Sequence, residues 1–160
     1  YAQKVLLSHN VHRANHSASA LVWSDHLALS ARKIAISCVY AHNTAVDGGG
    51  YGQNIAAGIS ADNVTAVVTD LFYNSEVEWF LGLYQQQQPS MANFEHWGHF
   101  SQVVWKSTTK VGCATVDCSA KGLSNVGADV NPIFTVCNYD PPGNYENEYA
   151  RNVGEPLNYP

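Results

Sequence analysis

The sequence predicts an α+β fold in which the helices come first and the strands come last. Apolar residues recur at helical spacing through the first half of the chain, whereas β-branched and aromatic residues dominate the last third. Helices and strands do not alternate strictly, as they would around a parallel sheet. We therefore expect one layered domain over residues 1–160, without an internal repeat.

Two helices are expected in the first quarter of the chain. The first runs from Tyr1 to about Asn15. The second follows Ser24 or Asp25, either of which can cap its first turn. Its apolar residues are spaced by four, three and four positions and so form one inward stripe, which comprises Leu27, Ala31, Ile34 and Cys38.

A third helix is expected from about residue 60, after a loop. The glycine-rich stretch 48–52 predicts the loop, because glycine adopts backbone conformations that are closed to other residues. Ser60 or Asp62 can cap the helix. Its apolar face comprises Val64, Val67, Val68, Leu71 and Phe72. Glu76 follows Phe72 by four positions and therefore leaves the helix end on its inward side.

The second half of the chain predicts a long loop and then three strands. Residues 80–97 are rich in aromatic residues and glutamine without a clear period, and long loops in compact domains are often binding loops. Three later segments are rich in β-branched and aromatic residues and are separated by turn-forming stretches. We expect strands at residues 103–105, 111–118 and 133–139.

The four cysteines predict two disulfides. They include no Cys-x-x-Cys pair, which argues against a zinc ribbon or a thioredoxin-like site. Cys113 and Cys118 are five positions apart, so on one straight strand they face opposite sides of the sheet. This parity suggests that one reaches Cys137 on the neighbouring strand and the other reaches Cys38 on a helix packed over one face. The sequence alone allows three pairings.

Composition limits the partners of the chain. The formal net charge is −5, and no run of Lys or Arg offers a surface for a phosphate backbone, so nucleic acid is not an expected partner. No stretch reaches the ~18 consecutive apolar residues that span a bilayer, which leaves only peripheral membrane contact. The sequons at Asn15 and Asn63 are glycosylation candidates and fit a secreted, extracellular protein. A monomer or weak dimer is expected.

Four segments together resemble the signatures of the CAP superfamily, which comprises cysteine-rich secretory proteins, antigen 5 and pathogenesis-related class 1 proteins. They occur in the family's order, at residues 9–13 (His-Asn-Val-His-Arg), 52–55 (Gly-Gln-Asn-Ile), 98–105 (Gly-His-Phe-Ser-Gln-Val-Val-Trp) and 134–145. The chain looks most similar to fungal and plant pathogenesis-related class 1 proteins. This resemblance implies an α-β-α sandwich, with a central antiparallel sheet between helical layers and a large cleft. It also implies disulfides Cys38–Cys118 and Cys113–Cys137.

The resemblance also implies a cleft tetrad of two histidines and two acidic residues. The matching positions here are His42, Gln53, Glu76 and His99. Gln53 stands where relatives carry Glu, so the cleft loses one carboxylate but gains two donors. One interpretation is a site for a divalent ion, Zn or Mg, on His42 and His99, with Glu76 ligating through water or orienting a histidine. The other is a hydrogen-bonded cluster that holds the cleft walls together.

Neighbouring polar residues could join either a metal site or a hydrogen-bonded cluster. Glu95 and His96 lie in the same stretch as His99 and are further metal-ligand candidates. Two protein nitrogens alone make a weak zinc site, since tight binding usually needs three or four protein ligands. Gln53, Asn54 and Asn138 are expected to act mainly as partners for backbone groups.

A lipid site follows from the resemblance as well. In sterol-binding relatives an aromatic loop just before the Gly-His-Phe segment contributes to sterol capture. The matching residues here are Phe80, Tyr84, Met91, Phe94 and Trp97. The alternative is that these side chains pack onto the sheet as core. In some relatives a second apolar site, between the two central helices, binds fatty acids.

We predict a secreted carrier of small apolar ligands, sterol first and fatty acid second, in defence or host interaction. The chain is not expected to be an enzyme, because it has no nucleophile elbow, no His-Glu-x-x-His helix and no Cys-His pair. A metal-dependent hydrolase or protease and a non-enzymatic interaction or signalling module are the alternatives. The segment from Asp140 resembles a peptide that some plant members release as a defence signal, but departs from it after Asn144.

Overall fold

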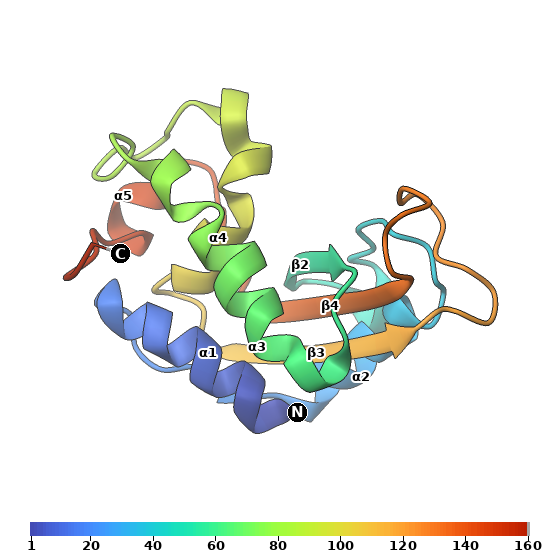
Figure 1. The fold of residues 1–160 in the computed structure, drawn as a ribbon. Helices are drawn as coiled ribbons and strands as arrows, with labels where there is room; N and C mark the ends of the chain where they lie inside the picture. Colours follow the sequence, from blue (N-terminus) through green and yellow to red (C-terminus); the bar gives the residue numbers. More distant parts are fainter. Residues whose placement is uncertain (160) are drawn as a thin grey trace.

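A four-stranded sheet lies at the centre of the structure, a computed structural model that describes residues 1–159 (Figure 1). The strand order is β1 (Val22–Trp23), β3 (Lys110–Asp117), β4 (Ile133–Asp140) and β2 (Gly52–Ala57). The strands β3, β4 and β2 are antiparallel to their neighbours, whereas the short β1 runs parallel to β3. The predicted central antiparallel sheet is therefore confirmed apart from this edge.

Helices cover both faces of the sheet, which confirms the α-β-α layering (Figure 1). On one face, α2 (Asp25–Ala35) packs against β3 and β4. The other face carries α1 (Ala2–Asn15), α4 (Gly98–Val104) and a helix that is α-helical at Val64–Ala66 (α3) and π-helical at Val67–Asn74 (η3). Shorter elements are η1 (Val46–Gly48), η2 (Ala61–Asn63), η4 (Val77–Phe80), η5 (Met91–His96) and α5 (Tyr149–Asn152).

The second helix begins as predicted but ends early. The Ser24 side chain accepts a hydrogen bond from the Leu27 amide at 3.2 Å, which caps the first turn. Leu27, Ala31 and Ile34 are buried on the sheet. Cys38 was expected on the same helix, but the helix ends at Ala35 and Cys38 has a positive φ of 54°. Cys38 therefore forms its disulfide with Cys118 from the irregular segment that follows the helix.

Close packing of α2 on β3 depends on one glycine. A Cβ atom at Gly112 would lie 2.3 Å from the Ala28 nitrogen and 2.5 Å from the Ser24 carbonyl oxygen. Both are backbone atoms, so they cannot move aside as a side chain can. Gly112 thus lets the first turn of the helix rest directly on the strand.

Three sequence predictions about secondary structure were wrong. Val103, Val104 and Trp105 were predicted as a strand, but α4 covers residues 98–104. This helix is buried on all sides, so its apolar residues are contiguous instead of periodic. Residues 80–97 are not a loop throughout, because η5 forms within them. Ser60 makes no side-chain cap hydrogen bond, and Asp62, the other predicted cap, lies inside η2.

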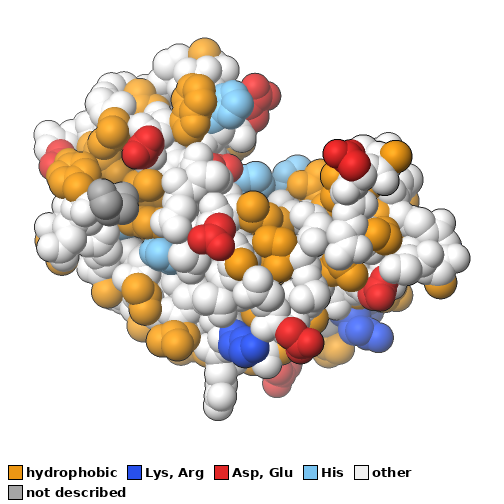
Figure 2. All heavy atoms as spheres, in the orientation of Figure 1, with side chains coloured by type: hydrophobic (Ala, Val, Ile, Leu, Met, Phe, Trp, Pro, Cys, Tyr) orange, Lys and Arg blue, Asp and Glu red, His pale blue; other side chains and the backbone are white. Residues whose placement is uncertain are grey.

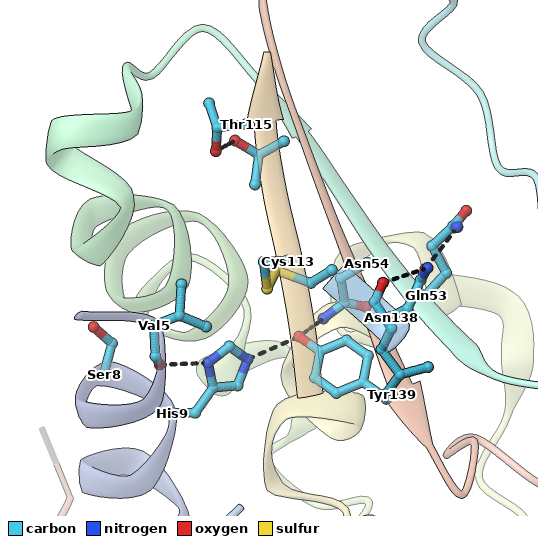
Figure 3. Close-up of a disulfide and its surroundings, with 12 residues drawn as sticks. Val5, Ser8, His9, Gln53, Asn54, Cys113, Thr115, Asn138 and Tyr139 are labelled. Atoms are coloured by element: carbon cyan, nitrogen blue, oxygen red, sulfur yellow. Dashed lines mark hydrogen bonds between the residues drawn. A yellow bond between two sulfur atoms is a disulfide. The ribbon is translucent and has the colours of Figure 1, made fainter. Parts of the chain in front are cut away.

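Both disulfides join the pairs that the family resemblance implied. Cys113 and Cys137 face each other across β3 and β4, with their Cα atoms 4.1 Å apart (Figure 3). Cys38 and Cys118 are 80 positions apart and connect the chain after α2 to the end of β3. On the chain-entropy argument, closing a loop of this length stabilises the fold by roughly 4 kcal/mol.

Candidate ligand-binding cleft

A cleft opens on the face shown in Figure 2, where histidine side chains gather at the base of a notch. Two adjoining cavities form it. One, of about 460 Å³, is called the polar cavity because the tetrad side chains His42, Gln53 and His99 line it, together with apolar residues such as Phe94. The other, of about 360 Å³, is lined mainly by apolar residues that include Leu71 and Val130. The lining residues that the two share are Tyr40, Ile55 and His99.

Glu76 fixes the ring of His99. The His99 Nδ1 atom lies 2.6 Å from Glu76 Oε1, and the Phe100 amide donates to the other carboxylate oxygen at 2.9 Å. Phe72 stacks on the imidazole with 5.1 Å between ring centroids. Since a carboxylate oxygen only accepts, Nδ1 is the donor, and in the neutral ring Nε2 carries the free lone pair. Glu76 is 6% exposed, which confirms its predicted inward position.

Gln53 fixes the ring of His42 in the same way. Its Nε2 atom donates to the Asn43 carbonyl at 3.0 Å and to Asn138 Oδ1 at 2.9 Å. These bonds set the amide orientation, so Oε1 is the atom that accepts from the Asn43 amide at 3.0 Å and from His42 Nδ1 at 3.1 Å. Nε2 of His42 is therefore also the lone-pair nitrogen. Gln53 supplies the acceptor that a glutamate would, without its charge.

The first sequence motif supports the cleft from below. His9 Nδ1 donates to the Val5 carbonyl at 2.8 Å, and its Nε2 accepts from the Tyr139 hydroxyl at 2.8 Å (Figure 3). Asn54 donates to the same hydroxyl at 3.3 Å and to the His99 carbonyl at 3.1 Å. Burial lowers the pKa of His9 to about 4. A buried chain of hydrogen bonds thus runs from α1 to the cleft floor.

Arg13, from the same motif, is a structural residue. It is fully buried, and no carboxylate among residues 1–159 pairs with it. Its guanidinium donates to the carbonyls of Ser19, Val103, Trp105 and Thr108 at 2.8–3.0 Å. Burial lowers its pKa to about 10. Arg13 therefore ties the ends of α1 and α4 together.

The comparison with known families follows this geometry. The family model described as CAP, Cysteine-rich secretory protein family, matches residues 6–139. The chain belongs to the CAP family. A probable pathogenesis-related protein of Arthroderma benhamiae is 53% identical over 95% of this chain and 48% of its own length. Secreted protein RBT4 of Candida albicans is 38% identical, over 90% and 36%.

A plant relative agrees with this membership, and a solved structure shares the fold. Pathogenesis-related protein 1A of Nicotiana tabacum is 35% identical over 91% of this chain and 78% of its own length. The crystal structure of NaASP2 with Zn²⁺ matches with a TM-score of 0.75 at 22% identity, over 97% of this chain and 85% of that one. The chain spans less than half the length of the two fungal relatives. CAP proteins are generally not conventional enzymes.

All four tetrad positions of this CAP domain reach the cleft. His42, Gln53 and His99 line the polar cavity, and Glu76 lines the adjoining one. Among residues 1–159, no three His, Cys, Asp or Glu side chains are placed to share a metal ion. The tetrad supplies two histidine nitrogens to the cleft, fewer than the three or four protein ligands of a tight zinc site.

The two further metal-ligand candidates face each other at the cleft rim. Glu95 lines the polar cavity, and its Oε1 atom lies 3.5 Å from His96 Nε2. The His96 ring stacks on Trp79 with 4.3 Å between centroids. His96 is therefore engaged at the rim, away from the tetrad.

The five candidate lipid residues divide between core and surface. Phe80 and Trp97 are 1% and 0% exposed, so for these two the alternative of core packing is correct. Tyr84 is half-buried, and burial raises the pKa of its hydroxyl. Phe94 lines the polar cavity, and Met91 is 46% exposed on η5. Sequence periodicity could not separate these roles.

Part of the cleft lining was missed in the sequence. Tyr40, Val126 and Val130 line the apolar cavity, and all three come from irregular segments. The stretch before β4 was interpreted only as a Gly, Ser, Asn and Pro turn. Two valines four positions apart in this polar stretch were the available signal.

The two sequons and the last segment differ in accessibility. The Asn15 amide donates to the Asn158 carbonyl at 2.9 Å, so a glycan there would displace the C-terminal segment. Asn63 is exposed and remains a glycosylation candidate. Asn144, just after Asp140, accepts from the Ser101 hydroxyl and donates to the Gly98 carbonyl at 2.9 Å. In residues 1–159, no helix has the length and apolarity to cross a membrane.

Proposed function

We propose that this CAP domain binds one small apolar ligand in the cleft, a sterol in first place and a fatty acid in second. The observation that carries this proposal is that the cavity lined by the tetrad side chains adjoins a second one lined mainly by apolar residues, with Tyr40, Ile55 and His99 shared between them. A ligand with an apolar body and one polar group matches that division. Cavities of a few hundred cubic ångströms are the usual size of small-molecule sites.

The apolar cavity supplies most of the affinity in this proposal. Its walls include Ile55, Leu71, Phe72 and Val126. Burying roughly 200 Å² of ligand surface there contributes about 5 kcal/mol at 25 cal/mol per Å². A ligand hydroxyl then donates to the lone-pair Nε2 atom of His42 or His99. A carboxylate only accepts and finds no partner in these lone pairs, which places the fatty acid second. Phe94 lines the polar cavity and would contact the bound ligand.

A divalent ion is a second, weaker ligand of the same cleft in this proposal. His42 and His99 would hold it through Nε2, and water would complete its coordination. Because Gln53 replaces the usual Glu, Glu76 is the one tetrad carboxylate that attracts the cation. The relative crystallised with Zn²⁺ is similar to this chain in fold. The ion would bind the ligand's polar group and would not catalyse hydrolysis.

We further propose that the protein acts outside the cell, in defence or host interaction. Two disulfides and no free cysteine among the described residues suit an oxidising compartment. The printed names of the relatives, a secreted protein and pathogenesis-related proteins, support the same setting.

Binding of labelled cholesterol, with and without a chelator, tests this proposal. Val126→Asp places a charge in the apolar cavity and should weaken binding at least tenfold, about 1.4 kcal/mol. Val11→Asp is the matched control, because Val11 is 59% exposed on α1 and lines neither cavity of the cleft. Equal binding by both variants would place the ligand elsewhere. Peptide cleavage without sterol binding would favour the hydrolase. If the protein neither binds sterol nor cleaves peptide, the interaction module is favoured.

A further inference from the structure

Strand β3 is left open along half of its outer edge. β1 pairs with it only at Val22↔Lys110 and Trp23↔Val111. The last hydrogen bond runs from the Ser24 amide to the Val111 carbonyl at 2.9 Å. Ser24 then caps α2, which packs over one face of the sheet and does not pair with the edge of β3. Beyond Val111, β3 therefore has β4 on one side, and none of the described residues forms a strand on the other.

The open edge presents unpaired backbone groups. The N–H and C=O groups of a strand alternate in direction, so Cys113, Thr115 and Asp117 point to the same side as Val111. Within residues 1–159, no backbone hydrogen bond from that side reaches Cys113 or Thr115. Residues 112–116 contain no lysine or proline, which commonly protect exposed edges. The edge is thus a free template for another strand.

A groove of about 490 Å³ follows this edge. Its floor is Cys113, Ala114 and Thr115, and its lining is mainly apolar. One wall is α2, where Leu29 is 60% exposed. The opposite wall is Tyr1, whose hydroxyl lies 2.7 Å from Thr115 Oγ1. The walls therefore belong to the two helical layers, one on each face of the sheet.

The walls match the alternation of an extended peptide. α2 begins beside Gly112 and ends with the Ala35 carbonyl 3.9 Å from Cys118 Sγ, so it runs along the whole open edge. Successive side chains of an added strand would point to α2 and to Tyr1 in turn. Arg32 lines the groove and makes no ion pair or side-chain hydrogen bond within the described residues. An acidic side chain would complement it.

We propose that this groove binds an extended peptide of another protein, which adds a strand to β3. The peptide carries small apolar residues at alternate positions and an acidic residue opposite Arg32. Backbone hydrogen bonds to Cys113 and Thr115 supply affinity, and the walls supply specificity. A second copy of this chain is a poorer fit, because its own β3 edge is recessed between the same walls.

A fluorescent peptide library tests the proposal on the intact chain. The library is Val-Thr-Val-Thr-Val-Asp with each Val varied among Ala, Val, Ile and Leu, capped at both ends. Fluorescence polarisation measures the affinity of each peptide. Hydrogen exchange measures the protection of the Cys113 and Thr115 backbone amides. The best peptide should bind and protect both amides at least tenfold. N-methylation of alternate peptide amides, in the register that faces β3, should abolish binding.

Two leucine variants supply the protein controls. Leu29→Lys blocks the groove from an exposed position and should weaken peptide binding at least tenfold, about 1.4 kcal/mol. Leu7→Lys is matched, because Leu7 is 68% exposed on α1 and lies outside the groove, and it should bind unchanged. The proposal would be overturned if every library peptide bound with a Kd above about 1 mM. Undiminished binding of N-methylated peptides, or protection of both amides by dimerisation without peptide, would overturn it as well.

Discussion

Acidification should destabilise this domain through His9. The side chain is fully buried, and burial lowers its pKa from 6.5 to about 4, with Arg13 and His12 adding smaller charge effects. The unfolded chain therefore binds this proton first as the pH falls. The contribution of neutral His9 is complete above pH 6.5 and is lost between pH 6.5 and 4. At 1.36 kcal/mol per pKa unit, the loss is roughly 3 kcal/mol.

Urea unfolding at pH 7, 5.5 and 4 measures this loss. His9→Gln keeps a hydrogen-bonding side chain between Val5 and Tyr139 but does not titrate. Its free energy of unfolding should fall by about 3 kcal/mol less than that of the wild type over the same range. His12, whose pKa burial also lowers to about 4, contributes equally to both proteins. An identical fall in both would refute a neutral, buried His9.

Three further predictions concern other parts of the structure. Gly112→Ala should destabilise the domain by about 1–3 kcal/mol, because the new Cβ meets the backbone of α2, and urea titration at pH 7 reads this directly. Gln53→Glu should tighten Zn²⁺ binding at least tenfold in calorimetry, because it adds a carboxylate to the cleft. His99→Ala should reduce metal retention without unfolding the protein. Unchanged metal content in both variants would remove the tetrad from the metal proposal. Replacing Cys38 and Cys118 together by Ala should lower the melting temperature by roughly 10 °C in calorimetry, and an unchanged value would show that the closed loop adds nothing.

The elements that follow a simple period were predictable from the sequence. α2 was found from its apolar stripe and from Ser24 as cap, because one face of this helix is buried and the other is exposed. β3 and β4 were found from their β-branched residues. The opposite parity of Cys113 and Cys118 correctly indicated different partners for the two cysteines.

Elements without a period were not predictable. α4 is buried on every side, so its Val103-Val104 run has the composition of a strand. β2 contains Gly52, Gln53 and Asn54, which have low strand propensity, and it forms because it pairs with β4 along its whole length. Tertiary contacts decide such segments, and a single sequence does not display them.

The candidate site was predictable in its polar half only. The family resemblance gave His42 and His99, but not the hydrogen bonds that leave Nε2 free on both rings. The apolar half draws Val126 and Val130 from an irregular segment with no pattern of its own. Burial also separates Phe80, a core residue, from the aromatic residues that a ligand can reach.

Methyl chemical-shift mapping with unlabelled sterol tests the proposed cleft most directly. Saturable shifts at the methyl groups of Ile55, Leu71, Val126 and Val130 are the predicted result, since these residues line the apolar cavity. The methyl of Val11, on the outer side of α1, should stay unchanged. Shifts confined to the exposed Met91, or none at all at saturating sterol, would contradict ligand binding in the cleft.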